Sequence, residues 1–566
     1  MCEEYFTNHV LFRRKSIGKG NGFDSDARVS TRNFIEMITG KNYIGHRRSA
    51  KGKQQFRTFN PVTNIENSAV ITEASKEEID AAVTLAAAAF FSYSKKTGKE
   101  KAVFLRAIVS EITLLGDSLL ELYTSESGLS QERAIAERRR TLGQLNAFAD
   151  LLEEGSWVRA TIDTAQADRQ PVAKVDLRKM LVALGPIVVF GASNFPLAYS
   201  TAGGDTAAAL AAGCPVLVKS HPMHAGTGEL VSSAIIKAAK KTGMPDGVFS
   251  NLNSSGVEVG QLLVQHPKVK GVGFTGSIRA GRALFDLVMQ RPEPIPFFGE
   301  MGSVNPVVLL PKALQGKAAH WATVLAASIT LDAGQFCTNP GLLLGIKGPE
   351  LDEFKQHLAK EIQKQASLCM LHPDIHEAYC NGKESALAQE GLEVLASASI
   401  ALAENYAGQL LAEVSGGVFL KNPTLHREVF GPFSLLVVCE NRTELEEVLQ
   451  QLEGQLTGSI IATQEEMSTH ENLVQILQNK VGRMIFSGVP TGVQVCSSMQ
   501  HGGPYPASTD ARFTAVGVHS IQRWVRPVSF QNWPKSLLPE ALKDENMLRI
   551  LRTVNGVKTK ISLRDV

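Results

Sequence analysis

Three short segments carry residue types that together could perform nucleophilic chemistry. Cys337 lies in the run GQFCTNPG, Glu300 in GEMG and Asn194 in SNFP. A cysteine attacks as its thiolate, and at an ordinary pKa of about 8.5 few thiols are ionised at neutral pH, so a base or a dipole must assist. A carboxylate can act as a base, and an amide N–H can stabilise a developing oxyanion. The three residues are therefore a candidate nucleophile, base and oxyanion donor.

These segments resemble the aldehyde dehydrogenase superfamily, and the resemblance extends to GFTGS at 273–277 and EVFGP at 428–432. The spacing from Glu300 to Cys337, 337 − 300 = 37 residues, agrees with it, and the similarity runs from roughly residue 35 to the C-terminus. By this resemblance Cys337 attacks an aldehyde, while Asn194 and the backbone N–H of Cys337 steady the oxyanion. Hydride then passes to a nicotinamide, and Glu300 activates the water that hydrolyses the thioester.

The resemblance also implies which residues bind the dinucleotide. Lys219 would hydrogen-bond the adenosine ribose, Gly276 and Ser277 would hold the pyrophosphate, and Glu428 with Phe430 would hold the nicotinamide ribose. Ser277 is predicted to begin a helix, where free backbone amides and the positive end of the dipole favour a phosphate group. The fingerprint GxGxxG is not present, which fits the variant mode of cofactor binding in this superfamily.

The position three residues after Lys219 bears on the choice between NADP and NAD. Members of the superfamily that prefer NAD often carry an acid there, whereas this chain has Pro222 in the run KSHP. Because no carboxylate would repel a 2′-phosphate, we expect NADP to be accepted, with NAD as the other candidate cofactor.

The resemblance narrows to one branch of the superfamily. PIPFFGEMG at 294–302 and HGGPYPA at 501–507 look like the branch of α-ketoglutarate semialdehyde (2,5-dioxovalerate) dehydrogenases and NADP-dependent fatty aldehyde dehydrogenases. It implies that His501 is an auxiliary base near the thiol, although a histidine beside Gly-Gly-Pro can equally be a structural hydrogen-bonding group. Arg138 and Arg140 match the arginine-bearing stretch of the semialdehyde branch and could bind a substrate carboxylate, the alternative being a solvated helix face.

The function implied by this resemblance is NAD(P)-dependent oxidation of an aldehyde to a carboxylic acid, from α-ketoglutarate semialdehyde to α-ketoglutarate. Medium- or long-chain aliphatic aldehydes are an alternative substrate class. Acyl transfer to coenzyme A is disfavoured, because relatives that do this generally lack the base that Glu300 supplies. A catalytically silent structural or binding protein is the alternative of another class, and the presence of Cys337, Glu300 and Asn194 together argues against it.

Composition and charge restrict the partners. The 566 residues include 58 Lys and Arg against 56 Asp and Glu, a formal net charge of +2, which creates no basic field for nucleic acid or a membrane surface.

Seven scattered cysteines show no paired CxxC spacing, so we expect no metal site and no disulfide framework, and a cytoplasmic location. The most apolar stretch, 180–192, falls short of the ~18 residues of a spanning helix. We therefore expect a small-molecule aldehyde as partner.

Apolar runs of strand length alternate with helical segments from Val182 onward, which is typical of βαβ units. The fold is predicted to be α/β, with a Rossmann-like parallel-sheet cofactor domain, an α/β catalytic domain and a small β oligomerisation element. The predicted strands of the first of these domains cover 187–190, 216–219, 247–249 and 269–274.

Domain boundaries follow from the same pattern. We expect a disordered extension at 1–33, a cofactor-binding domain at 34–298 interrupted by an interface hairpin at about 155–180, a catalytic domain at 299–505, and a C-terminal segment at 506–566 with an oligomerisation strand. In relatives the hairpin pairs with a neighbouring subunit, so a homodimer or homotetramer is expected.

Overall fold

The computed structural model describes residues 38–398 and 403–565. The predicted disordered extension at 1–33 lies outside these residues. The chain divides into Met1–Ile38 and Thr39–Val566, and all of the elements named below lie in the second unit. Within the described residues, no helix is long and apolar enough to cross a membrane.

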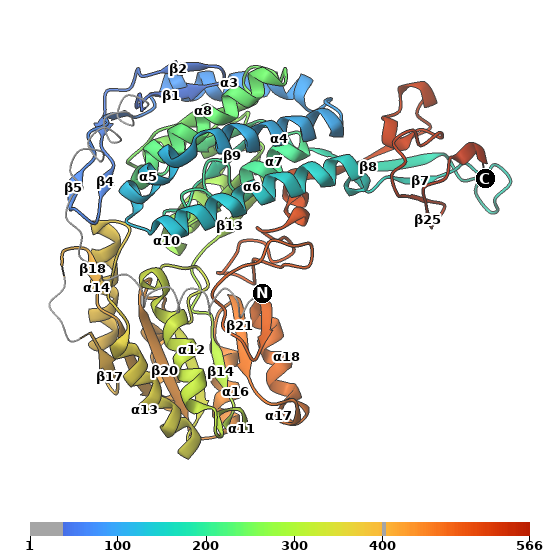
Figure 1. The fold of residues 1–566 in the computed structure, drawn as a ribbon. Coiled ribbons are helices and arrows are strands. Elements are labelled where there is room, and N and C mark those ends of the chain that lie inside the picture. The colour runs from blue at the N-terminus through green and yellow to red at the C-terminus, as the bar shows by residue number, and fades with distance from the viewer. Residues whose placement is uncertain (1–37, 399–402, 566) are drawn as a thin grey trace. The chain divides into compact units, whose positions relative to one another are not determined.

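The first sheet has seven strands in the order β13-β12-β9-β10-β11-β1-β2 (Figure 1). Its first five strands are parallel to one another, whereas β1 and β2 are added antiparallel at the far edge. The strands are β1 (Asn42–Ile44), β2 (Arg47–Ser49), β9 (Ile187–Phe190), β10 (Val216–Lys219), β11 (Phe249–Leu252), β12 (Gly271–Thr275) and β13 (Phe297–Glu300). The expectation of a Rossmann-like parallel sheet is confirmed.

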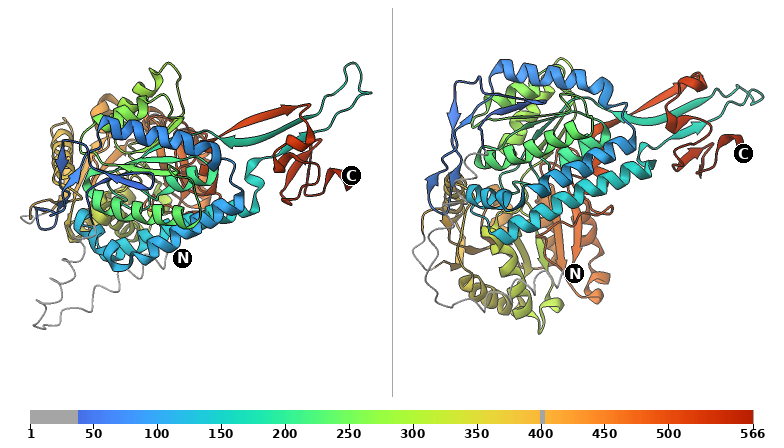
Figure 2. Two further views of the ribbon diagram at one scale, coloured as in Figure 1. Left: turned by 90° about the horizontal axis from the view of Figure 1, so that it is seen from above. Right: turned by 45° about the horizontal axis from the view of Figure 1, so that its top comes forward.

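Helices connect these strands and cover the sheet. They are α7 (Gly204–Ala212), α8 (Ala225–Lys241), α9 (Glu258–Gln265) and α10 (Ile278–Met289), preceded by α3 (Lys76–Tyr93), α4 (Gly98–Leu114), α5 (Gly116–Ser127) and α6 (Gln131–Glu154). Apolar side chains of α3, α9 and α10 share one buried cluster with Val188, Phe190 and Leu217 of the sheet. Figure 2 shows the long helices lying over the strands of this sheet. The central strand β9 is apolar at all four positions and β10 at its first three, as expected for strands that are buried on both faces.

The connection between β9 and α7 differs from the expectation. The sequence predicts a helix soon after Pro196, but α7 begins only at Gly204 and the residues between form turns. The predicted end of that helix is confirmed, because Gly213 caps it with φ +98°, a left-handed conformation that favours glycine. The long turn region carries Asn194 at the carboxyl edge of the sheet.

The predicted domain boundary at 298/299 is wrong in one respect, because it cuts β13. Thr275 of β12 pairs with Glu300 of β13, so the candidate base ends a strand of the first sheet and does not begin the second domain. The late segment around Ser508 also returns to this edge, where Ser508 bridges to Glu300 and the Met301 amide donates to the Ala507 carbonyl at 2.8 Å. Hydrogen bonding between segments that are distant in sequence decides which sheet a strand joins, and this pairing cannot be predicted from the local sequence.

The second sheet also has seven strands, in the order β17-β19-β20-β15-β14-β21-β22, with every neighbouring pair parallel except β17 with β19. Its strands are β14 (Val307–Leu309), β15 (Leu342–Ile346), β17 (Glu393–Ser397), β19 (Leu410–Ser415), β20 (Phe433–Cys439), β21 (Gln455–Ile461) and β22 (Val481–Phe486). The flanking helices are α11 (Pro311–Leu314), α12 (Ala318–Thr330), α13 (Pro349–Lys364), α14 (Pro373–Leu387), α15 (Gly416–Lys421), α16 (Arg442–Gln451), α17 (Gln464–Thr469) and α18 (Glu471–Lys480).

A third, five-stranded sheet has the order β23-β8-β7-β24-β25. The predicted hairpin corresponds to β7 (Thr161–Asp163) and β8 (Leu177–Ala183), which pair antiparallel, and β8 also pairs along its length with β23 (Val525–Gln531). The C-terminal strands β24 (Arg552–Val554) and β25 (Val557–Thr559) complete the sheet. Small two-stranded sheets join β3 (Gln55–Phe56) to β6 (Ile71–Thr72), β4 (Phe59–Asn60) to β5 (Ile65–Glu66), and β16 (Leu368–Cys369) to β18 (Tyr406–Ala407).

Candidate active site

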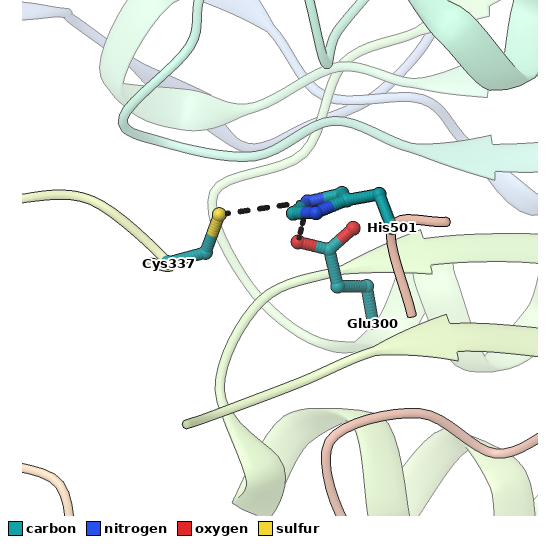
Figure 3. Close-up of side chains that lie close together, drawn as sticks. All are labelled: Glu300, Cys337 and His501. Carbon is teal, nitrogen blue, oxygen red and sulfur yellow. Dashed lines mark hydrogen bonds and ion pairs between the residues drawn. The ribbon is translucent and has the colours of Figure 1, made fainter. Parts of the chain in front are cut away.

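Three side chains from distant parts of the chain meet at the carboxyl end of β13. Glu300 ends that strand, Cys337 follows the short helical turn η4 (Leu331–Gly334), and His501 lies in the segment that returns to the edge of the first sheet. His501 Nε2 is 2.9 Å from Glu300 Oε1 and 3.7 Å from Cys337 Sγ (Figure 3). Glu300 and His501 are 2% and 1% exposed, so water screens their interaction poorly. The predicted nucleophile, base and auxiliary base are thus in mutual contact.

The environment shifts the pKa values of the two acids in opposite directions. Burial raises the pKa of the Glu300 carboxyl, but the charge and hydrogen bond of His501 outweigh it and leave that pKa below its usual range. The pKa of the Cys337 thiol lies well above its usual range, because burial and the nearby Glu300 carboxylate both disfavour the thiolate. The resting site therefore holds a carboxylate next to a protonated thiol, so the thiol needs a proton acceptor when it attacks.

Asn194 lies directly beside the nucleophile loop. Its side-chain amide donates a hydrogen bond to the Gln335 carbonyl at 3.0 Å, two residues before Cys337. An amide group carries two N–H donors, so one donor of Asn194 can still reach an oxyanion. On the other side of the loop, Asn305 Nδ2 donates to the Cys337 carbonyl at 2.9 Å and holds the backbone of the nucleophile in place.

A buried charged network fixes the two loops that carry Asn194 and Cys337. Glu137 on α6 accepts hydrogen bonds at 2.8 Å from the amides of Leu197 and Ala198, just after Asn194. One helical turn earlier, Arg133 lies with its guanidinium carbon 4.4 Å from the ring centroid of Phe195, next to Asn194, and 4.7 Å from that of Phe336, next to Cys337. Helix α6 thus contacts both loops at once.

The residues that the resemblance assigns to the adenosine ribose and pyrophosphate lie at the carboxyl end of β10 and just after β12. Lys219 ends β10, and burial lowers the pKa of its ammonium group to about 8. Ser277 is the N-cap of α10, with its hydroxyl accepting from the Ala280 amide at 3.3 Å. A Cβ added to Gly276 would come within 2.8 Å of the Phe274 ring, so glycine keeps this turn compact at the start of the helix. A helix N-terminus after β12 and a buried cation at the end of β10, the two strands that flank β9, would fit a dinucleotide pyrophosphate and ribose.

Glu428 and Phe430 line a cavity together with residues of the nucleophile loop, among them Phe336 and Asn339. Burial raises the pKa of the Glu428 carboxyl to about 8. A Cβ on Gly302 would come within 2.6 Å of Glu428 Oε2, so this carboxyl lies close to the chain that leaves Glu300. The cavity is therefore close to the candidate base, as a nicotinamide ribose site should be.

The two candidate arginines on α6 point to different places. Arg140 Nη2 donates to the Tyr199 hydroxyl at 3.0 Å, and the Tyr199 ring centroid is 6.0 Å from that of His501. Arg138 Nη1 instead donates to the Gly116 carbonyl at 2.8 Å, at the start of α5. Residues two apart on a helix point about 200° apart, so one helix cannot present both to the same site. The structure brings Arg140, and not Arg138, to the active site.

Several residues near the site have no signal in the sequence. Tyr199 follows Asn194 on the same loop, and Arg483 on β22 interacts electrostatically with both Cys337 and Tyr199. The Nε atoms of Arg140 and Arg483 are buried and, in the described part of the chain, have no hydrogen-bond partner. The acid Glu137 in the run ERRR could have been found from its position before the arginines, whereas Arg483 in VGRMIF lies in no recognisable motif.

Comparison with known proteins agrees with this geometry. Residues 47–472 match the model of the aldehyde dehydrogenase family. The chain belongs to the aldehyde dehydrogenase family. It is therefore an oxidoreductase that acts on aldehydes and uses NAD or NADP, and the family predicted from the sequence motifs is confirmed.

Two curated relatives are similar over nearly their whole length. The chain is 45% identical over 521 residues to an α-ketoglutaric semialdehyde dehydrogenase 2 of Azospirillum brasilense, and 42% identical over 522 residues to an α-ketoglutaric semialdehyde dehydrogenase of Acinetobacter baylyi. Each alignment covers 92% of this chain and 99% of the relative. Among solved structures, a 1-pyrroline-5-carboxylate dehydrogenase from Thermus with bound NAD superimposes with a TM-score of 0.74 at 19% identity, covering 92% of this chain and 99% of that one. The structural match supports the fold.

Proposed function

We propose that this aldehyde dehydrogenase oxidises α-ketoglutarate semialdehyde to α-ketoglutarate with NADP or NAD. The observation that carries the proposal is the contact of Cys337, Glu300 and His501 near Arg140, whose Nε has no hydrogen-bond partner among the described residues. The names of the two relatives above 40% identity agree with this substrate.

In the first step the Cys337 sulfur attacks the aldehyde carbon. Because burial and Glu300 raise the pKa of the thiol, its proton must leave as the bond forms. The Glu300 carboxylate, which interacts with the thiol, is the proton acceptor in reach, and His501 Nε2 donates to this carboxylate at 2.9 Å and positions it. The negative charge on the aldehyde oxygen is stabilised by the free N–H of Asn194 and the backbone N–H of Cys337, an interaction of about 3 kcal/mol for one well-aimed donor.

A bound nicotinamide supplies the hydride acceptor that converts the thiohemiacetal to a thioester. Lys219, Gly276 and Ser277 would hold its adenosine ribose and pyrophosphate, while Glu428 and Phe430 would hold its nicotinamide ribose. After the proton taken from the thiol has left to solvent, Glu300 takes a proton from water, which attacks the thioester carbon. The C–S bond then breaks, the carboxylic acid leaves and the Cys337 sulfur takes the proton back from Glu300.

Substrate recognition is assigned to Arg140. An oxoacid aldehyde carries a carboxylate at the end remote from the reacting carbon, and a guanidinium is the side chain best suited to pair with it. Arg140 lies against the Phe195 and Tyr199 rings, 5.9 Å and 5.2 Å from their centroids, with its Nε buried and unpartnered among the described residues. Arg138 bonds the Gly116 carbonyl and is not carried forward as a substrate contact. Arg483 is not assigned to the substrate either, because its Nη1 and Nη2 donate to the carbonyls of Gly492 and Pro490.

NADP is proposed to be accepted because Pro222 occupies the position of the acid common in NAD-specific relatives. Pro222 begins the turn η3 (Pro222–His224), immediately past Lys219 and Ser220. The neighbouring histidines His221 and His224, stacked with centroids 5.1 Å apart, add no negative charge that would oppose a 2′-phosphate.

We also propose a cytoplasmic oligomer. Cys214, Cys337, Cys369, Cys380, Cys439 and Cys496 are all free thiols, as in a reducing compartment. The third sheet ends in β23, an edge strand that pairs on one side with β8 and offers its other side to a neighbouring subunit. A homodimer or homotetramer is expected, and light scattering on the purified protein distinguishes these from a monomer.

The experiment that tests the activity measures absorbance at 340 nm with the purified protein. NADP and NAD are compared, each with α-ketoglutarate semialdehyde and with hexanal. A kcat/KM at least about tenfold higher for the semialdehyde supports the assigned substrate. Turnover of hexanal alone would keep the cysteine mechanism and replace the substrate by an aliphatic aldehyde, while no turnover of either by folded protein would overturn both.

A further inference from the structure

Cys337, His501 and Glu300 form a set of potential metal ligands. One atom from each residue, a sulfur, an imidazole nitrogen and a carboxylate oxygen, lies within 4.8 Å of the other two. The three come from separate parts of the chain, and their side chains point toward one another in Figure 3. Across residues 38–398 and 403–565, this is the one group of His, Cys, Asp and Glu side chains that could hold a metal ion in this way.

The spacing of these atoms suits a tetrahedral Zn²⁺ ion. With Zn–S of about 2.3 Å and Zn–N and Zn–O of about 2.0 Å, a tetrahedral site places sulfur about 3.6 Å from nitrogen and nitrogen about 3.3 Å from oxygen. The corresponding distances in the structure are 3.7 Å from Cys337 Sγ to His501 Nε2 and 2.9 Å from His501 Nε2 to Glu300 Oε1. The nitrogen–oxygen separation would therefore have to widen by about 0.4 Å, while the Cys337 sulfur and the Glu300 oxygen lie within 4.8 Å of each other.

The charges and ligand types favour Zn²⁺ over harder cations. The Glu300 Oε2 atom is buried with no hydrogen-bond partner among the described residues, so the carboxyl group has an oxygen free to bind a cation. Thiolate and imidazole suit zinc, whereas Mg²⁺ prefers a shell of oxygen ligands and retains its water. The fourth position would remain with water, as in zinc sites that have three protein ligands.

We propose that the catalytic triad of Cys337, His501 and Glu300 is an inhibitory Zn²⁺ site. On binding, the Cys337 thiol and His501 Nε2 release their protons to solvent, the imidazole stays neutral with its proton on Nδ1, and the sulfur and Nε2 lone pairs form bonds to Zn²⁺. Glu300 Oε1 exchanges its hydrogen bond from His501 for a bond to the metal. No oxidation is involved, and removal of the metal restores the thiol. The bound ion occupies the nucleophile and the base together, so aldehyde is excluded until the ion leaves.

The metal site is tested by calorimetry on metal-free protein kept reduced with a phosphine, titrated with ZnCl₂ and, separately, with MgCl₂. We expect one Zn²⁺ per chain and no binding of Mg²⁺ at the same concentrations. His501→Gln should weaken Zn²⁺ binding at least about tenfold, because it removes one ligand of three. Cys496→Ser, which removes an exposed thiol outside the site, is the matched control and should bind as the wild type does.

Alkylation by iodoacetamide gives a second measurement that needs no substrate. Zn²⁺ should slow alkylation of Cys337 in the wild type, and EDTA should restore it. Equal Zn²⁺ affinity in the wild type and in folded His501→Gln would overturn the site, since a thiol alone would then hold the metal. Absence of saturable binding by the wild type would overturn it as well. Neither calorimetry nor alkylation requires an aldehyde substrate, so these measurements can reject the zinc site without testing the proposed function. Only the claim that Zn²⁺ inhibits turnover rests on the proposed function.

Discussion

Arg133 on α6 and Asp332 in the turn before the nucleophile form an ion pair, with Nη1 2.6 Å from Oδ2. Asp332 itself has a left-handed backbone, with φ 45°, in a turn that ends three residues before Cys337. Arg133 also lies 3.5 Å from Glu137, which accepts hydrogen bonds from the loop of Asn194. The pair therefore links the oxyanion donor to the nucleophile through one helix.

Breaking that pair should impair catalysis more than substrate binding. We expect Asp332→Asn to lower kcat about tenfold to 100-fold with KM for the aldehyde little changed, because small displacements of reacting groups are costly. Asp332→Glu, which keeps the carboxylate, should recover part of the loss. Arg106→Met on α4, which removes an exposed ion pair with Asp150, is the control and should leave kcat unchanged. A larger effect on KM than on kcat for Asp332→Asn would contradict the positioning role.

Glu300→Gln should separate acylation from hydrolysis. Without the carboxylate no group in reach takes the proton of the attacking water, so the thioester accumulates. Steady-state turnover should fall about 10²-fold to 10⁴-fold. Rapid mixing should still show a burst of reduced cofactor approaching one equivalent per site. A loss of the burst together with the steady-state rate would mean that the Cys337 thiol cannot attack the aldehyde without the Glu300 carboxylate as its proton acceptor.

The reactivity of Cys337 should rise with pH beyond the neutral range. Its pKa is raised well above the ordinary value by burial and by Glu300, so the thiolate fraction of the free enzyme is small at pH 7 and grows about tenfold for each pH unit up to that pKa. Iodoacetamide alkylation followed by mass spectrometry measures this. In Glu300→Gln the carboxylate charge is gone, the thiol pKa falls, and alkylation at pH 8 should be faster than in the wild type. A plateau near neutral pH in the wild type would contradict the raised pKa.

Pro222→Glu should turn the cofactor preference toward NAD. The new carboxylate would lie three residues past Lys219, where it can bind a 2′-hydroxyl and repel a 2′-phosphate. We expect KM for NADP to rise at least about tenfold while KM for NAD changes little. Steady-state kinetics with each cofactor at saturating aldehyde provides the measurement, and Pro222→Ala is the control for loss of the proline alone. Equal changes in KM for NADP and for NAD would mean that residue 222 does not lie near the 2′-position of the adenosine ribose.

Arg140→Met should discriminate between substrates. Loss of a charged hydrogen bond to the oxoacid carboxylate costs about 1.5–3 kcal/mol, or roughly 10-fold to 100-fold in kcat/KM, and should affect α-ketoglutarate semialdehyde but not hexanal. Arg138→Met is the matched control on the same helix, since its guanidinium bonds the Gly116 carbonyl. The assignment of Arg140 fails if both aldehydes lose activity equally or if Arg138→Met shows the same selectivity.

Some parts of this protein could be predicted from the sequence because they are encoded locally. The strands at 187–190 and 216–219 match β9 and β10, since three or four consecutive buried apolar residues between turn signals leave little choice of structure. Ser277 was expected at a helix start and is the N-cap of α10. The motifs around Cys337 and Glu300 identified the family, because each is a contiguous run.

The tertiary structure decided what depends on distant pairing. Glu300 and His501 are 201 residues apart in sequence, and their contact arises because the late segment pairs with the edge of β13. The same pairing places Glu300 in the first sheet, against the predicted boundary. Local sequence reports the residue types and the periodicity of an element, but long-range hydrogen-bond register and helix packing decide which side chains meet. The sequence alone was therefore enough to identify the family. Which of Arg138 and Arg140 reaches the active site was decided by the packing of α6 against the loop that carries Tyr199.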